Sequence, residues 1–413
     1  MNEKNNIAIE IAWTYLITNK KMTGVAALGV TLGIAVFIFM NCMMAGFEVW
    51  SNEAVFRSSP HIRIYRDAET SRSLLPTTPT GNIPMIVNPK VVPESNTIIN
   101  PFALVKMLRQ QKDVTVVSPQ ITANVFYNNG KSQISGQAYG ILSEEANQMF
   151  DIKSFMVEGN YDNLKAVPNG ILIGVGIADK MSVRTGDNIS LTSSKGITKV
   201  MKVVGLFQSN NSLVDKSKSY INLAFAQQLL KENNTYITDI NVNITDFNQS
   251  KEAAQFYSQI TNYKAEDWQT ANETLVAGSR MRAIIIRAVS LAILLVAGFG
   301  IYNILNMTIT QKINDIAILK AMGFKGKDVV KIFVTQALLI GVLGVSVGLL
   351  LASLLIQRMS AVYVGGDIGF FPITFDAFQY IKGIVFGLVI TFLAGFIPAQ
   401  RAAEVDPVAI FRK

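Results

Sequence analysis

Histidine, the residue type that most often serves catalysis or metal binding, occurs once in this sequence. A Ser-His-Asp triad would depend on His61, and a cluster of histidine metal ligands is excluded because the chain has no second histidine. His61 also lies at the start of a predicted strand, HIRIY, which favours a structural role. The sequence therefore predicts no catalytic residue and no metal-binding residue.

Two glycine-containing segments invite comparison with phosphate-binding loops. The segment GFKGKD, residues 323–328, lacks the full G-x-x-x-x-G-K-[ST] spacing and the hydroxyl residue that would hold magnesium. The segment GVGIADKM, residues 174–181, matches a glycine-rich nucleotide loop incompletely. We expect that the chain binds no cofactor and does not hydrolyse ATP by itself.

The segment QKINDIAILKAMGFKGKDVVK, residues 311–331, has an unusual setting. It contains five lysines and two aspartates, whereas the runs on either side carry no charged residue. Its first half predicts a short helix with an apolar side, in which Asn314 or Asp315 caps the start and Gly323 stops the helix. A solvated connecting loop would not need that apolar side, but a helix that docks into a groove on a partner protein would use it.

The elements around this segment are predicted to span a membrane. Half of the residues are hydrophobic and 16% are charged, against about a quarter in soluble proteins. Runs without Asp, Glu, Lys or Arg occur at 22–47, 288–311, 332–357 and 383–400, the last of them preceded by an apolar turn from Phe378. About 18 such residues suffice to cross the hydrocarbon core as a helix, and the first run is too long for a cleaved signal peptide. We therefore predict a membrane protein with four transmembrane α-helices.

Lysine and arginine in the short segments predict the orientation. They precede the first run, fill 311–331 and follow the fourth run, and positive residues are retained in the cytoplasm. Both termini are then cytoplasmic, and the long segment between the first two spans lies outside. The net charge of +8 largely reflects this asymmetry, and no basic cluster with interleaved aromatics points to nucleic acid.

The outer segment is predicted to be a mixed α+β domain. Short β-branched runs such as VTVVS, NVFYN, NISLT, KVVGLF and DINVNI read as strands, and PFALVKMLRQQ, EEANQMF, LAFAQQLLKE and KEAAQFYSQI have helical periodicity. Cys42, the only cysteine, lies in the first span, so this domain holds no disulfide. A proline-rich interval at 67–101 is either functional or disordered.

These predictions divide the chain into nine segments. They are a cytoplasmic interfacial helix 1–21, a first span 22–47, an outer domain 48–279, a stalk with the second span 280–311, a cytoplasmic helix and loop 312–331, a third span 332–357, an outer loop 358–377, a fourth span 378–399 and a cytoplasmic tail 400–413.

The stretch QKINDIAILKAMGFKGKDVVKIFVTQALLIGVLGVSVGLLLA resembles the permease domain of the FtsX and MacB class of ABC transporters. In that class the segment is a coupling helix that sits on the ATPase subunit, and the outer domain is a MacB-like periplasmic core domain. The ending IPAQRAAEVDPVAIFRK is similar to the C-terminal end of the class, with Pro398 closing the fourth span and Asp406 capping a last helix that begins at Pro407. The residues that the resemblance assigns to ATPase coupling are Asp315, Ile316, Ala317, Leu319, Lys320, Met322 and Gly323.

Within that class the sequence most resembles LolC and LolE, the transmembrane subunits of the lipoprotein-releasing system. A G-F-E at residues 46–48 follows the first span, and a P-H-I at 60–62 opens the first strand. The resemblance implies a bacterial inner-membrane permease that extracts lipoproteins by mechanotransmission, driven by a dimer of a separate cytoplasmic ATPase that binds ATP and Mg. Further implied partners are a second permease protomer, identical or paralogous, a lipoprotein or other lipid-anchored substrate, and a periplasmic chaperone or adaptor.

The outer end of the first span carries soft apolar side chains that suit acyl chains. We assign the substrate cavity to Phe39, Met40, Met43, Met44 and Phe47. Two alternatives remain open: a MacB- or DevC-like efflux permease working with a periplasmic adaptor and an outer-membrane channel, and FtsX-like signalling to a periplasmic hydrolase.

Overall fold

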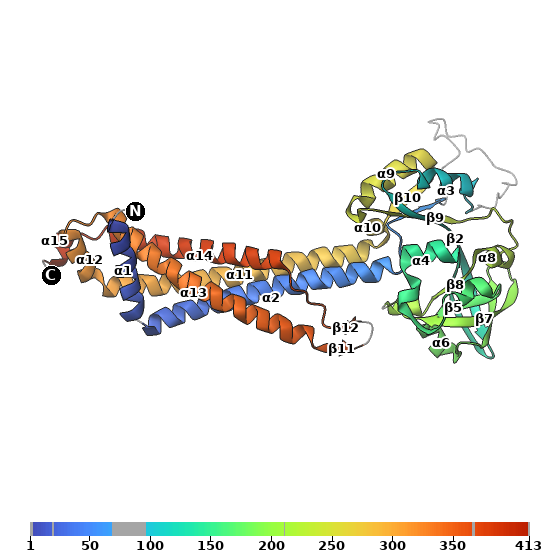
Figure 1. Ribbon diagram of the computed structural model, residues 1–413, viewed down its shortest axis with the longest axis horizontal. Coiled ribbons are helices and arrows are strands. Elements are labelled where there is room, and N and C mark those ends of the chain that lie inside the picture. The colour runs from blue at the N-terminus through green and yellow to red at the C-terminus, as the bar shows by residue number, and fades with distance from the viewer. Residues whose placement is uncertain (1–2, 19, 68–95, 210, 366–367, 412–413) are drawn as a thin grey trace, which may run out of the picture. The chain divides into compact units, whose positions relative to one another are not determined.

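The computed structural model describes residues 3–18, 20–67, 96–209, 211–365 and 368–411 (Figure 1). It consists of two compact units. Met1–Ser51 and Ala277–Lys413 form what we call the helical unit, and Asn52–Val276 forms the mixed unit. Most of the proline-rich interval 67–101 lies outside the described residues.

Within the described residues, four helices are long and apolar enough to cross a membrane, which agrees with the predicted number of spans. They are α2 (Lys20–Phe56), α11 (Glu273–Gln311), α13 (Gly326–Ser360) and α14 (Ala377–Ala403). The shorter elements of the helical unit are α1 (Glu3–Thr18), α12 (Ile313–Ala321), α15 (Pro407–Phe411) and the hairpin strands β11 (Tyr363–Gly365) and β12 (Gly369–Phe370). In Figure 1, α1, α12 and α15 gather at one end of this unit, with both ends of the chain.

Small residues let the spanning helices approach closely. A Cβ atom added at Gly344 of α13 would lie 2.6 Å from Cβ of Val30 on α2, so only glycine fits there. At the same glycine, the hydroxyl of Thr31 donates to the carbonyl oxygen of Gly344 at 3.2 Å. The core of the bundle is therefore built around α2, with Ile34 and Ile38 fully buried in it.

The fourth spanning helix does not end at its proline, and that prediction is wrong. Pro398 lies inside α14, which continues to Ala403. A proline inside a helix removes one backbone hydrogen bond, but neighbouring helices can compensate for this in a packed bundle. Pro398 is buried in the bundle, and the helix continues for more than a turn beyond it.

The mixed unit is built on one sheet of ten strands, which confirms the predicted α+β domain between the first two spans. The order is β10-β1-β9-β2-β3-β8-β5-β7-β4, and β6 pairs with β2 and β7. The strands are β1 (Ile62–Tyr65), β2 (Val114–Asn129), β3 (Ser132–Ile141), β4 (Met156–Gly159), β5 (Gly170–Gly174), β6 (Asn188–Ser193), β7 (Thr198–Phe207), β8 (Lys218–Asn222), β9 (Asp239–Ile244) and β10 (Lys264–Asp267).

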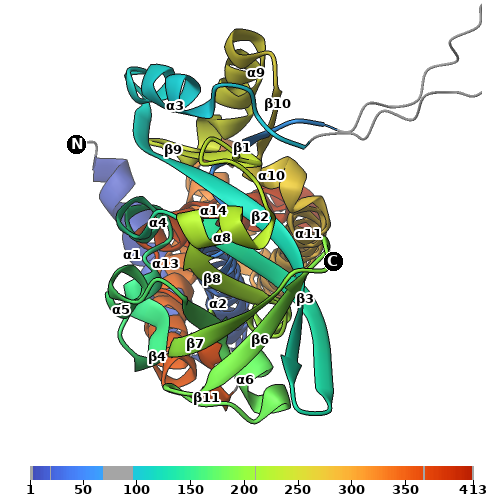
Figure 2. The same cartoon turned by 90° about the vertical axis from the view of Figure 1, so that its right-hand side faces the viewer.

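Helices cover this sheet. They are α3 (Pro101–Arg109), α4 (Ser143–Phe150), α5 (Asn163–Ala166), α6 (Val175–Met181), α7 (Ser212–Asp215), α8 (Leu223–Leu229), α9 (Ser250–Thr261) and α10 (Trp268–Ala271), with short 3₁₀ turns at Ile152–Phe155 and Phe247–Gln249. Figure 2 shows β2 running through the unit, with α3 and α9 beside β9 and β10 at one end of the sheet. The four helices predicted from periodicity are all present, as α3, α4, α8 and α9.

Two runs that the sequence predicts as separate strands, VTVVS and NVFYN, belong to the single long strand β2. Pro119 lies between them, and a proline normally interrupts a sheet because it cannot donate to the ladder. Pairing with β3 begins only at Gln120, so Pro119 has a neighbouring strand, β9, on one side alone. The strand can therefore continue through the proline.

Candidate functional site

The segment predicted to contact an ATPase forms α12, a helix of nine residues that follows α11 directly. The amide of Lys312 still donates to carbonyl oxygens of α11, those of Thr308 at 3.0 Å and Ile309 at 3.1 Å. Because the two helices are almost continuous, no residue is placed to cap α12. The predicted cap at Asn314 or Asp315 is wrong, since both lie inside the helix and Asp315 instead pairs with Lys312 at 2.9 Å.

Gly323 ends α12, as the sequence predicts. Its φ of 94° is in the left-handed region that favours glycine. The amide of Gly323 donates to the carbonyl oxygen of Lys320 at 3.1 Å, and that of Phe324 to Leu319 at 3.2 Å. These two bonds form a Schellman motif, which fixes the direction in which the chain leaves the helix.

The two sides of α12 have different surroundings. Ile316 and Ala317 are 0% exposed, and Ile316 packs in a cluster with Tyr15 of α1 and Phe333 of α13. Ile318 and Met322, four residues apart and thus on one face, are 47% and 64% exposed. The predicted coupling residues are therefore split, since Ile316 holds α12 to its own chain and Ala317 is buried, while Met322 faces outward.

A groove of about 440 Å³ runs between α1 and α12. Its floor and walls combine apolar side chains with two carboxylates, Glu10 and Asp315. The other residues that line it are Ile11, Thr14, Tyr15, Ile318, Leu319 and Met322. The groove thus places Asp315, Leu319 and Met322 of the predicted set together with residues of α1 that the sequence did not indicate.

Lys320 points to a different part of the helical unit. Its ammonium group donates to the carbonyl oxygens of Ala403 at 2.9 Å and Val405 at 2.6 Å, at the end of α14. The following helix, α15, begins at Pro407, and the amide of Val408 donates to the Asp406 carboxylate at 3.0 Å, which confirms the predicted cap. Lys320 consequently ties α12 to the C-terminal segment.

The predicted substrate residues on α2 are all half-buried, and the structure brings three of them together. Met43, Met44 and Phe47 line a cavity of about 190 Å³ with side chains of α11 and of the segment that connects α13 and α14, whereas Phe39 and Met40 do not line it. The guanidinium carbon of Arg282 lies 4.3 Å from the centre of the Phe47 ring. The cavity is apolar, with one cation among its lining residues.

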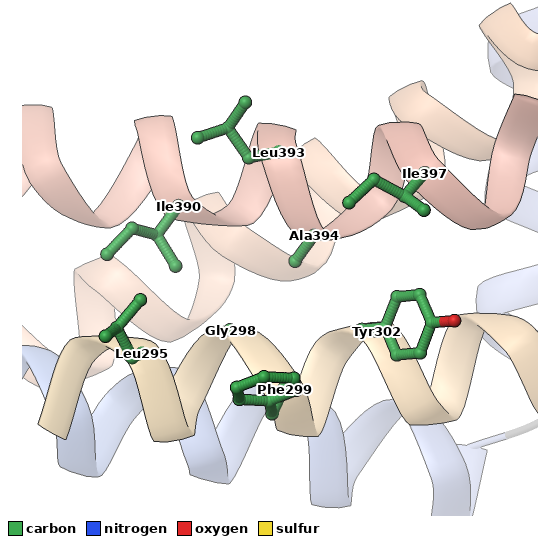
Figure 3. Close-up of a pocket in the computed structure, with 8 residues that line it drawn as sticks. All are labelled: Leu295, Gly298, Phe299, Tyr302, Ile390, Leu393, Ala394 and Ile397. Carbon is green, nitrogen blue, oxygen red and sulfur yellow. The ribbon is translucent and has the colours of Figure 1, made fainter. Parts of the chain in front are cut away.

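A second apolar groove, of about 430 Å³, lies between α11 and α14 (Figure 3). Leu295, Phe299 and Tyr302 of α11 face Ile390 and other aliphatic side chains of α14. The sequence alone does not indicate this groove, because every one of these residues also suits plain lipid contact. Gly298, which narrows α11 where α14 approaches, was the one available signal.

The remaining chemical candidates have structural surroundings. The amide of His61 donates to Asn243 at 3.0 Å, its Nδ1 lies 3.1–3.2 Å from the backbone of Ile244, and burial lowers the pKa of the ring. The segment 174–181 forms the end of β5 and α6, with Ile177 in the core of the mixed unit. Both arrangements tie these residues into the fold of the mixed unit.

The described residues include four helices that could span a membrane, a large mixed domain between the first two, and a short, partly exposed helix between the second and third. Together these features define a multi-pass permease subunit of the ABC-transporter type. The chain belongs to the family described as having a MacB-like periplasmic core domain, matched over residues 23–260, and an FtsX-like permease C-terminal region, matched over residues 287–407.

Curated relatives are similar to the chain over most of its length. The lipoprotein-releasing system transmembrane protein LolE of Haemophilus influenzae is 22% identical, over 98% of this chain and 99% of that protein. LolC of the same organism is 25% identical, over 95% of this chain and 93% of that protein. A macrolide export ATP-binding/permease protein, MacB 2 of Yersinia pestis, is 22% identical over 73% of this chain and 45% of that protein.

Proposed function

We propose that this permease extracts lipoproteins, or other lipid-anchored molecules, from the inner membrane, using ATP hydrolysed by a separate cytoplasmic ATPase. The observation that carries the proposal is the similarity to LolE and LolC, which extends over nearly the whole of each protein. A match of this extent includes the spanning helices and the mixed unit alike.

The exposed face of α12 supports the coupling part of the proposal. Ile318 and Met322 present apolar surface next to the groove that α1 and α12 share, and Glu10 and Asp315 add negative charge there. An apolar groove with charged edges is the kind of surface that accepts a helix or loop of another protein. We assign this surface to the ATPase, with α12 on the cytoplasmic side.

The assignment changes the role of several predicted coupling residues. Asp315, Leu319 and Met322 would contact the ATPase, because they line the groove. Ile316 would carry its movement into the chain, because it packs in a cluster with side chains of α1 and α13, and Ala317 is buried next to it in the sequence. Lys320 would carry the movement to the end of α14 through its two bonds to backbone carbonyls. ATP and Mg belong to the ATPase, and this chain holds no cofactor in the proposed mechanism.

Two helices could relay that movement past the membrane. α2 and α11 each continue through the boundary between the helical unit and the mixed unit. The cavity of Met43, Met44 and Phe47 adjoins α11, where a shift of one helix against the other changes its volume. An acyl chain held there would be expelled as the helices move, with energy from ATP offsetting about 0.8 kcal/mol per exposed methylene.

A second protomer fits the exposed surface of α11. The exposed side chains on this helix include Leu291, Leu295, Val296 and Phe299. Only 22% of the residues in its most apolar 18-residue segment are buried. Apolar side chains in a spanning helix face either lipid or another helix. We place the second protomer here, identical or paralogous, and expect a periplasmic chaperone or adaptor to contact the mixed unit.

A test of the proposal is depletion of the protein followed by separation of inner and outer membranes. Mature lipoproteins should accumulate in the inner membrane, and re-expression of the wild-type chain should restore their sorting. Normal lipoprotein sorting combined with sensitivity to an exported drug would instead support the efflux role that the similarity to MacB keeps open. Normal sorting with a defect in cell-wall hydrolysis would support FtsX-like signalling.

A further inference from the structure

A cavity of about 240 Å³ in the mixed unit is unlike the apolar grooves of the helical unit. It lies where residues 58–60 connect α2 to β1, and β-strands from the middle of the sheet contribute hydroxyl, amide and charged side chains. Two cations, Arg63 and Lys218, line it together with one carboxylate, Glu266. The proposed transport function uses none of these residues.

Lys218 is the first residue of β8 and is 6% exposed. Its ammonium group donates to the carbonyl oxygen of Ser58 at 3.1 Å. Three aromatic rings surround it, with centres 4.2 Å away for Tyr139, 5.0 Å for Tyr220 and 5.5 Å for Phe150. In the part of the chain that the structure describes, no ion pair joins Lys218 to a carboxylate.

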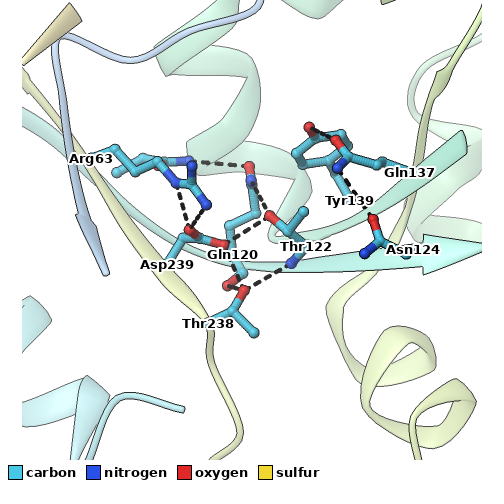
Figure 4. A network of polar contacts seen from close by, with 9 residues as sticks. Arg63, Gln120, Thr122, Asn124, Gln137, Tyr139, Thr238 and Asp239 are labelled. Carbon is cyan, nitrogen blue, oxygen red and sulfur yellow. Dashed lines mark hydrogen bonds and ion pairs between the residues drawn. The ribbon is translucent and has the colours of Figure 1, made fainter. Parts of the chain in front are cut away.

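Arg63, the other cation, already has a partner. Its guanidinium group contacts the buried carboxylate of Asp239 at 2.5 Å and 2.6 Å. Asp239 also accepts hydrogen bonds from Thr122 at 2.8 Å and Thr238 at 2.5 Å, as Figure 4 shows. The negative charge of Asp239 is thus held on the Arg63 side of the cavity.

A buried ammonium group without a carboxylate is costly, because desolvation opposes its charged form. Burial, reinforced by the charge of Arg63, lowers the pKa of Lys218 to about 7. An anion in the cavity would offset that cost and would be attracted by both cations. The rings of Tyr139 and Phe150 would contact any apolar part of the same molecule.

We propose that this cavity binds a small organic anion, whose carboxylate or phosphate group lies beside Lys218 and Arg63. The polar side chains around it are held in place by mutual hydrogen bonds. Gln120 accepts from Asn241 at 3.1 Å, and Gln137 contacts both Asn124 at 3.2 Å and Tyr139 at 2.6 Å (Figure 4). Such fixed partners favour a specific ligand over a diffuse ion atmosphere.

The position of the cavity gives the ligand a consequence for the fold. The Lys218–Ser58 bond joins the middle of the sheet to the residues that follow α2. An anion that keeps Lys218 protonated would strengthen this bond and fix the start of β1. Binding of the ligand would therefore strengthen a contact made by the residues that follow α2, a spanning helix.

The test is calorimetric titration of the full-length chain in lipid nanodiscs with three probes, acetate, succinate and inorganic phosphate, between pH 6 and pH 9. The charged and titratable groups facing Lys218 are Arg63, Asp239, Glu266, Tyr139 and Tyr220. Burial raises the pKa of Tyr139 to about 12 and that of Tyr220 well above its usual value, so both stay neutral over this range. Wild-type affinity for acetate, which stays ionised over this whole range, should be constant below pH 7 and fall about tenfold per pH unit above it.

Three variants distinguish binding that depends on Lys218 from binding elsewhere on the chain. Lys218→Met should lower the affinity at pH 6 at least tenfold, and Lys218→Arg should bind acetate at pH 9 as at pH 6, because arginine stays charged. Lys202→Met, at an exposed lysine of β7, should bind as the wild type does. If Lys218→Met fails to fold, the pH profiles of the wild type and of Lys218→Arg still show whether the anion binds beside residue 218. Absence of binding to the wild type by all three probes at pH 6, or equal binding by a folded Lys218→Met chain, would overturn the proposal.

Discussion

The ammonium nitrogen of Lys320 lies 2.9 Å from the carbonyl oxygen of Ala403, so the helix proposed to receive force from the ATPase is bonded to the end of the last spanning helix. A second bond, to Val405 at 2.6 Å, extends this link toward α15. Hydrogen bonds that involve a charged donor contribute about 1.5–3 kcal/mol each. In the proposed mechanism, a movement of α12 would therefore be transmitted to α14 as well as to α11 and α13.

Replacing Lys320 with methionine should uncouple transport from ATP hydrolysis. The variant keeps Ile318 and Met322 on the outward face, so the ATPase should still co-purify. Lipoprotein release per ATP hydrolysed should fall several-fold in proteoliposomes, because the link to α14 is lost. Lys327→Met, at an exposed lysine that follows α12, serves as the control; an equal loss in both variants would contradict a specific role for Lys320.

Two isoleucines of α12 provide a matched pair. Ile316→Asp places a carboxylate in a fully buried position and should destabilise the helical unit by several kcal/mol, seen as loss of folded protein in detergent. Ile318→Asp changes an exposed position and should leave the chain folded but abolish co-purification with the ATPase. If folded Ile318→Asp retains the ATPase, the proposed docking face is wrong.

The cavity on α2 can be tested with two methionines of one helix. Met43→Phe should reduce lipoprotein release several-fold, because a larger and stiffer side chain enters a space of about 190 Å³. Met40→Phe changes a half-buried methionine that does not line the cavity and should behave nearly as the wild type. Release assays on reconstituted complexes, with ATPase rates measured in parallel, distinguish a blocked cavity from a misfolded chain; equal release by both variants would argue against the cavity.

The stability of the mixed unit should rise with pH between about 7 and 10. Burial lowers the pKa of Lys218 in the folded chain to about 7, whereas the unfolded chain keeps a value near 10.4. Between these values the unfolded state binds more protons, so raising the pH favours folding by about 1.4 kcal/mol per unit at most. Below pH 7 both states are protonated and this dependence vanishes.

Urea unfolding of a chain whose Trp13 and Trp50 are replaced by phenylalanine would follow this effect through Trp268. Lys218→Met should abolish the rise between pH 7 and pH 10, whereas Lys202→Met should keep it. A rise of the same size in Lys218→Met would assign the pH dependence to another group.

Much of the architecture could be predicted because single physical rules decide it. The charge-free run at 332–357 can only be accommodated in hydrocarbon or a large core, and Gly323 suits the left-handed end of α12 better than any other residue. Strands such as NISLT and DINVNI show a clear alternation of polar and apolar residues, and turn residues flank them. These features depend on local sequence, which is why they appear in the structure as β6, β9 and α13.

What escaped prediction depends on tertiary neighbours. Ile316 and Ile318 are chemically identical in the sequence, and only the packing of α1 and α13 decides which one is buried. The partner of Lys320 lies 83 residues away, and the strand β8 is short and begins with a lysine that a strand rule would place in solvent. Pro398 predicts the end of a helix when the sequence is considered alone, because the sequence does not show the bundle that surrounds this proline.

The pairing of β1 with β10 has a mechanical consequence. Ile62 opposes Asp267, and the amide of Trp268 donates to the carbonyl oxygen of His61, so the chain enters and leaves the sheet at the same end of an antiparallel pair. A force that drew these two connections apart would unzip the pair rung by rung and meet little resistance. A thrust along both connections would push the two strands in the same direction and leave the hydrogen bonds between them unstrained, so this junction withstands compression far better than separation.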